Sequence, residues 1–194
     1  MTGAGGGDRL SKEKMRLLVD GDLPAHDVKQ LIHAKDKDPD RFWTYLEILQ
    51  ERVPWSNKIL LRISEHLYIV RKEPEGRIVK CDCGHEFGDY RVNWKLSSEI
   101  FVRRSREALD EIYTTGIAPD PAIVEVREYY CPGCHAQLGV EVAPHGYPPV
   151  FEALPDLDGL YRDWLGAPLP DESPNWYQDR STSVTKNWAG QDRD

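Results

Sequence analysis

The sequence Cys81-Asp82-Cys83-Gly84-His85 and the later sequence Cys131-Pro132-Gly133-Cys134 contain all four cysteines of this 194-residue chain. A structural zinc ion takes four soft ligands in a tetrahedron, and two closely spaced cysteine pairs supply them once the chain folds back on itself. Gly84, Pro132 and Gly133 suit tight ligand turns, because glycine reaches positive φ at low cost and proline presets its φ. The spacing therefore predicts one zinc site made by Cys81, Cys83, Cys131 and Cys134.

A site of this kind points to structure rather than catalysis. Four thiolates close the coordination shell, whereas a catalytic zinc keeps one position open for water. The chain has no G-x-S-x-G sequence, no P-loop and no dinucleotide fingerprint. Its acidic residues are scattered as on solvated faces, without an evident acid and base pair. We therefore expect no catalytic residues in this chain.

Other chemistry can use the same side chains. Two disulfides are one alternative, but no apolar signal segment precedes the domain, so an oxidising compartment is not indicated. A second alternative is a redox-active dithiol at Cys131 and Cys134, and the presence of the pair Cys81 and Cys83 argues against it. An iron site shares the four ligands. His85 or His135 could replace a cysteine, or could support the site by hydrogen bonding.

The composition restricts the class of partner. Hydrophobic residues make up 40% of the chain and charged residues 30%, with a net charge of -8. A zinc-ribbon protein that binds nucleic acid would normally carry a basic face, so nucleic acid is not an expected partner. The chain has no run of 18 apolar residues, which argues against a membrane span. The expected location is the cytoplasm.

Helical signals fill residues 11–55. Ser11 can cap a first short helix that ends at Gly21, and Pro24 suits the start of a second. Asp38 can cap a longer third helix that stops before Pro54. Trp43 and Ile48 flank the apolar face of this third helix, so we expect it to need cover on two sides.

From residue 58 to 145 the apolar residues alternate with polar ones, which indicates antiparallel strands. Strands are expected around Ile59, Leu67 and Ile78, and again at 100–103, 123–130 and 138–142, with a helix near 105–113. Each cysteine turn then lies at a strand end. A zinc ion would tie two hairpins together, and its binding energy would stabilise the β-rich region.

The C-terminal part is expected to contain one helix at 156–166, capped by Asp156 and ended by Gly166. Its apolar stripe, at helical spacing, is Leu157, Leu160, Tyr161, Trp164 and Leu165. Docking of this stripe on its own domain is the preferred interpretation, and a partner groove is the alternative.

The sequence thus predicts an α+β fold with N-terminal helices, an antiparallel zinc-ribbon-like sheet core, a C-terminal helix and a flexible tail. Residues 11–170 are expected to form a single zinc-stabilised domain. Residues 1–10 are expected to be a flexible leader and residues 171–194 a flexible tail, in which Trp176, Tyr177 and Trp188 could anchor to a partner.

Several stretches with tryptophan, glutamate and cysteine follow one another at a spacing that no common fold would impose. They are Asp38-Pro39-Asp40-Arg41-Phe42, Pro54-Trp55, Lys80-Cys81-Asp82-Cys83-Gly84-His85-Glu86-Phe87, Asn93-Trp94-Lys95-Leu96-Ser97, Arg127-Glu128-Tyr129, and Trp164-Leu165-Gly166. In these stretches the chain resembles the gamma subunit of acetone carboxylase, from about Lys12 to Pro170. The leader and the tail look longer than is usual in that family.

This resemblance implies a small accessory subunit of an ATP-dependent ligase that converts acetone and bicarbonate to acetoacetate. Two larger subunits, alpha and beta, similar to hydantoinase and oxoprolinase subunits, would complete a heterohexamer. Manganese and ATP with magnesium are then expected in those partners, and zinc in this chain. A carboxylase for a larger ketone such as acetophenone is an alternative, and a zinc-ribbon adaptor for protein or nucleic acid is an alternative of another class.

Overall fold

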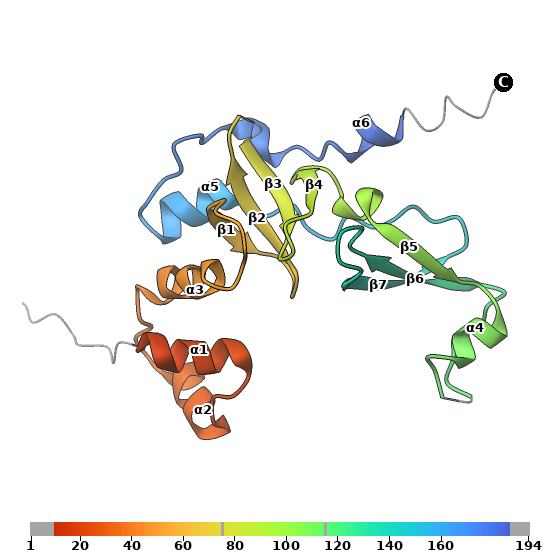
Figure 1. The fold of residues 1–194 in the computed structure, drawn as a ribbon, viewed down its shortest axis with the longest axis horizontal. Coiled ribbons are helices and arrows are strands. Elements are labelled where there is room, and N and C mark those ends of the chain that lie inside the picture. The colour runs from red at the N-terminus through yellow and green to blue at the C-terminus, as the bar shows by residue number, and fades with distance from the viewer. Residues whose placement is uncertain (1–9, 75, 115, 187–194) are drawn as a thin grey trace, which may run out of the picture.

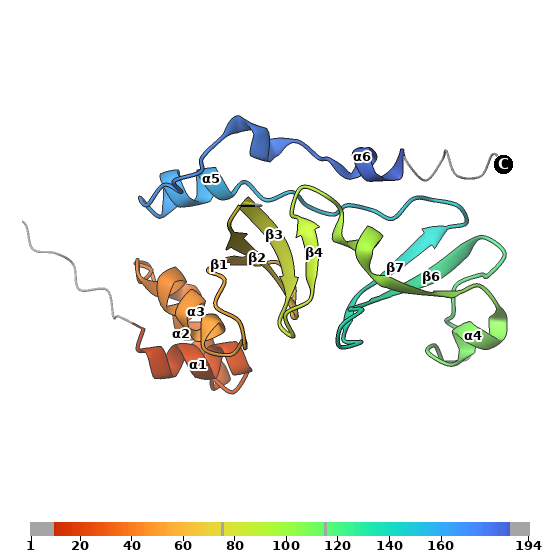
Figure 2. The same ribbon diagram turned by 45° about the horizontal axis from the view of Figure 1, so that its top comes forward.

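The structure is a computed structural model that describes residues 10–74, 76–114 and 116–186. Along the chain come a group of helices, a four-stranded sheet and a three-stranded sheet, after which the chain returns over the first sheet (Figure 1). Figure 2 shows the N-terminal helices and the second sheet at opposite sides of the first sheet. The predicted α+β class is confirmed.

The N-terminal helices are α1 (Lys12–Asp20), α2 (Ala25–His33) and α3 (Arg41–Gln50). The Ser11 side chain accepts a hydrogen bond from the N–H of Lys14, and Gly21 ends α1 at φ 79°. Both predicted ends of α1 are therefore confirmed. The cap predicted for α3 is wrong, because Asp38 instead accepts from the N–H groups of Leu10 and Asp40 and the helix begins at Arg41.

The first sheet is an antiparallel meander of β1 (Ile59–Arg62), β2 (Leu67–Lys72), β3 (Gly76–Cys81) and β4 (Glu86–Asp89), in that order. Helix α3 covers one face, where Leu46 and Leu49 pack with Tyr68 and Ile78. The other face belongs to a second core cluster. Because both faces are covered, the middle strands are buried almost continuously along their length.

The second sheet has the order β5-β6-β7, with β5 (Glu99–Arg103), β6 (Val124–Tyr130) and β7 (Gln137–Pro144). Helix α4 (Arg106–Asp110) follows β5, as predicted. The short 3-10 helix η1 (Trp94–Ser97) connects the two sheets. Its Trp94 ring contacts Phe87 of the first sheet and Tyr129 of the second at centroid distances of 6.2 and 5.9 Å. Aromatic packing therefore joins the sheets beside the cysteine turns.

The C-terminal helix begins as α5 (Leu157–Gly159) and continues as one π-helical turn, η2 (Leu160–Trp164). Asp156 caps it by accepting from the N–H of Gly159, as predicted. Leu157 and Tyr161 are each 1% exposed, so the helix docks on its own chain. Trp164 departs from the predicted stripe and is 86% exposed. The N–H of Leu165 bonds to the carbonyl of Leu160, and this wider turn rotates later side chains off the 3.6-residue stripe.

The second cover predicted for α3 comes from this helix. Trp43 packs edge-on against Tyr161 at 5.7 Å, and Ile48 is 1% exposed. The hydroxyl of Tyr161 donates to the carbonyl of Leu60 at 2.9 Å. The chain therefore covers both flanks of α3 itself.

The segment expected to be a flexible tail, 171–194, is described as far as residue 186. It contains η3 (Pro174–Tyr177) and α6 (Ser181–Thr185). The Trp176 ring lies 4.7 Å from the Arg77 guanidinium and 4.4 Å from that of Arg91, so this segment packs on the first sheet. Trp188 and the leader up to residue 9 lie outside the described residues.

No helix within the described ranges is both long and apolar enough to cross a membrane.

Candidate metal centre

Two hairpins from different sheets present the four cysteines. Cys81 ends β3, and the turn to β4 is closed by a bond from the Cys81 N–H to the His85 carbonyl at 2.8 Å. Cys131 follows β6, and its N–H donates to the Ala136 carbonyl at 3.0 Å before β7 begins. Gly84 adopts φ 103° in the first turn and His135 adopts φ 59° in the second. The predicted placement of each cysteine turn at a strand end is confirmed.

The structure brings the four sulfur atoms together. All four lie within 4.8 Å of one another. The Cys81 and Cys134 sulfurs are 3.8 Å apart, and the Cys83 and Cys131 sulfurs are 3.7 Å apart. A tetrahedron with zinc to sulfur bonds of about 2.3 Å has edges of about 3.8 Å. The donor set and its spacing therefore fit a tetrahedral thiolate site.

The same distances bear on the disulfide alternative. A disulfide needs sulfurs about 2.05 Å apart, and all four cysteines are free thiols in the structure. The Cys81–Cys134 and Cys83–Cys131 contacts each join one hairpin to the other. A tetrahedral ion places all four ligand sulfurs at similar distances from one another, within and between the turns, which fits four sulfurs that lie within 4.8 Å.

Burial differs between the two members of each pair. Cys81 and Cys131 are fully buried, whereas Cys83 and Cys134 are exposed. Burial raises the pKa of the Cys81 thiol strongly, because a thiolate would lose its hydration. A bound cation has the opposite effect and deprotonates a coordinating thiol. Metal-free protein would therefore hold a neutral thiol at the fully buried Cys81 position.

Groups around the first turn fix its backbone. The Trp55 indole N–H lies 3.1 Å from the carbonyl oxygens of both Cys81 and Asp82. Asp82 in turn pairs with His66 Nδ1 at 2.6 Å. The sequence analysis did not find these supporting residues, because nothing in their local spacing shows that they meet the turn.

The two candidate histidines lie outside the four-sulfur cluster. The His85 ring packs edge-on against Phe87 at 4.9 Å. His135 is an exposed side chain whose Nδ1 lies 3.1 Å from Glu99. A role for either histidine in supporting the metal site stays a prediction.

The two turns pack closely where they meet. A Cβ atom added at Gly133 would lie 3.1 Å from the His85 Cβ and 3.4 Å from the Cys83 sulfur. Glycine at this position therefore lets the second turn approach the first. The sequence analysis had explained Gly133 by turn geometry alone.

Comparison with known proteins agrees with the resemblance. The family model described as acetone carboxylase gamma subunit matches residues 53–165. The acetone carboxylase gamma subunit of Xanthobacter autotrophicus is 40% identical over 164 residues, which cover 84% of this chain and 97% of that protein. The acetophenone carboxylase beta subunit of Aromatoleum aromaticum is 32% identical over 81 residues, covering 41% of this chain and 63% of that protein. On the strength of the family match and the near full-length relative, this chain belongs to the acetone carboxylase gamma subunit family.

Proposed function

We propose that this chain is the small zinc-binding accessory subunit of an ATP-dependent acetone carboxylase. The observation that carries the proposal is the 40% identity to an acetone carboxylase gamma subunit along nearly its whole length. The four-sulfur cluster supports the zinc assignment, because its spacing fits the ion.

In this proposal the four cysteines hold zinc for a structural purpose. The ion would supply charge compensation for four thiolates and a cross-link between the β3–β4 and β6–β7 turns. The chain's own residues complete the site: Trp55 holds the first turn, and Gly133 allows the second to approach. Metal binding and folding are coupled in such sites, since the ligands converge only in the folded chain.

The rest of the machinery is assigned to partners. Two larger alpha and beta subunits would hold the nucleotide and manganese sites, complete a heterohexamer and join acetone to bicarbonate-derived carbon. The full assembly is proposed to be cytoplasmic. This chain would contribute no catalytic group, in keeping with a metal shell that leaves no open position.

A second candidate substrate is a larger ketone. The partial match to an acetophenone carboxylase subunit favours it, although that match spans less of both proteins. A free-standing adaptor for protein or nucleic acid is less well supported, because the net charge is -8.

The proposal is tested by tagging this chain and purifying it from its native host. Two larger subunits should co-purify in fixed ratio, and metal analysis should find one zinc for each copy of this chain. The complex should cleave ATP in a bicarbonate-dependent way with acetone, and acetophenone serves as the competing substrate. Isolation of the chain alone, or zinc-free yet fully folded, would contradict the proposal.

A further inference from the structure

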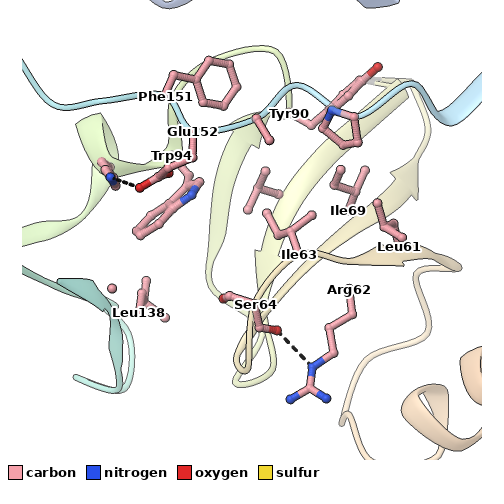
Figure 3. A pocket seen from close by; sticks show the side chains of 15 residues that line it. Leu61, Arg62, Ile63, Ser64, Ile69, Tyr90, Trp94, Leu138, Phe151 and Glu152 are labelled. Atoms are coloured by element: carbon pink, nitrogen blue, oxygen red, sulfur yellow. Dashed lines mark hydrogen bonds and ion pairs between the residues drawn. The ribbon is translucent and has the colours of Figure 1, made fainter. Parts of the chain in front are cut away.

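A cavity of about 440 Å³ lies between the two sheets. Leu61, Ile63 and Ile69 line it from the first sheet, while Trp94 and Leu138 face them from η1 and β7. Figure 3 shows these two groups of apolar side chains on opposite sides of the opening, with Phe151 above them. Its volume falls within the range of small-molecule pockets.

The lining of this cavity is mainly apolar, which suits an apolar ligand. Ile69, Val79 and Leu138 line the inner wall, and all three belong to the second core cluster, on the face of the first sheet opposite α3. Ile69 and Val79 are register partners in the first sheet, and Leu138 lies in β7 at an irregularity of its pairing with β6. The cavity is therefore framed by rigid elements, as preformed binding sites are.

The charged groups at the wall already have partners. Lys95 is 2% exposed at its side chain and pairs with Glu152 and with the carbonyl of Val150. Arg62 donates to the carbonyls of Ser64 and Glu65, and Figure 3 shows its guanidinium extending away from the apolar lining. A charged ligand would find no free counter-charge among these groups and would lose its hydration.

One polar group at the wall is unpaired. The Ser64 hydroxyl is buried and has no hydrogen-bond partner in the described part of the chain. By contrast, the Tyr90 hydroxyl donates to the Trp176 carbonyl at 3.1 Å. A buried hydroxyl without a partner costs free energy, and a ligand with one acceptor would recover it. The Ser64 oxygen is not accessible to solvent in this conformation, so ligand binding requires a change of the Ser64 side-chain torsion that turns the donor into the cavity.

We propose that the cavity between the sheets binds a neutral, mostly apolar ketone, with Ser64 donating a hydrogen bond to its carbonyl oxygen. The cavity's chemistry selects a neutral apolar molecule with one acceptor, and the choice of a ketone rests on the proposed function. The site would hold substrate in the accessory subunit, apart from any reacting centre.

The test uses the full-length, metal-loaded chain and three probes. Acetophenone carries an aromatic body and a carbonyl, ethylbenzene has nearly the same shape without the acceptor, and benzoate carries a charge. Calorimetric titration should show saturable binding of acetophenone, about 3–10-fold weaker binding of ethylbenzene, and none of benzoate at the same concentrations.

Variants locate the contact. Ser64→Ala should weaken acetophenone binding about 3–10-fold while leaving ethylbenzene binding unchanged, because only the first ligand has an acceptor. Ser183→Ala is the matched control, since this exposed serine bonds to the Arg180 carbonyl away from the cavity. Gly139→Leu, which adds volume at the wall, should block both ligands; its fold is checked by circular dichroism and metal content.

Absence of saturable binding, equal affinity for acetophenone and ethylbenzene, or an unaffected Ser64→Ala variant would overturn the proposal. These measurements need neither partner subunits nor turnover. Failure here therefore leaves the accessory-subunit assignment standing, and failure of co-purification does not alter the outcome of the titrations.

Discussion

Replacing Asp158 by alanine should destabilise the chain strongly, because it leaves a buried positive charge poorly paired. Arg77 is 0% exposed and Asp158 is 1% exposed at their side chains, and Arg77 Nη2 lies 2.5 Å from Asp158 Oδ1. Removing one partner of a buried ion pair typically costs about 3–5 kcal/mol. Asp171 still contacts Arg77 Nε at 2.9 Å, so we expect the lower end, about 3 kcal/mol.

Urea and thermal unfolding of the full-length, metal-loaded chain measure this effect. A loss of about 3 kcal/mol corresponds to a melting temperature lower by about 6–12 °C for a chain of this size. Asp163→Ala is the matched control, because this exposed carboxylate pairs only with its neighbour Arg162 among the partners described for it, and exposed pairs contribute little. It should change stability by less than about 0.5 kcal/mol.

The double variant Arg77→Met with Asp158→Leu isolates the cause. Removing both charges together leaves only the partly exposed Asp171 without its arginine, so much of the lost stability should return. A single Asp158→Ala change that costs less than about 1 kcal/mol would refute the reasoning. So would a double variant as unstable as the sum of the two single changes.

Three further predictions follow from the metal centre, the C-terminal helix and a buried carboxylate. Cys131→Ser should lower zinc content and unfold the second sheet, because one ligand is lost; a fully folded variant with normal zinc by metal analysis and circular dichroism would disprove this. Tyr161→Phe removes the hydrogen bond to the Leu60 carbonyl and should cost about 1–3 kcal/mol in urea unfolding, whereas Trp164→Ala should cost less than about 0.5 kcal/mol because that side chain is 86% exposed; the reverse order would contradict the packing. Burial alone would raise the pKa of Glu125, but hydrogen bonds from Arg104, Arg127 and His145 lower it to about 2, below the ordinary value of 4.5. The stability it contributes is therefore present above pH 4.5 and is lost as the pH falls towards 2, so Glu125→Gln should flatten the acid dependence of the urea midpoint while the exposed Glu13→Gln control should not.

The sequence predicted elements whose signals are local. Alternation located the strands around Ile59, Leu67 and Ile78, and the capping residues Ser11 and Asp156 marked true helix starts. The four cysteines also predicted their own convergence, because two close pairs are typical ligands of one metal ion. Local chemistry was sufficient in each of these cases.

Features set by distant contacts were missed. Strand β4 carries a single buried residue, Phe87, so alternation could not show it. The predicted stripe assumed a period of 3.6 residues to the end of the C-terminal helix. The π-helical turn at Leu160–Trp164 breaks that period, so Trp164 lies off the stripe. Arg77 is buried within β3 only because Asp158 and Asp171 return to it from far along the chain. Hydrophobic patterning does not encode such pairings.

The position of Trp176 between Arg77 and Arg91 bears on where the folding unit stops. The family model ends at residue 165, yet Asp171 and Trp176 beyond it supply a counter-charge and an aromatic cover to a fully buried arginine. A chain shortened at residue 165 would uncover Arg77 and remove its ion pair with Asp171, leaving the ion pair with Asp158. The packed part of the chain therefore extends past the end of the family-model match, and shortened versions should retain residues through at least Tyr177.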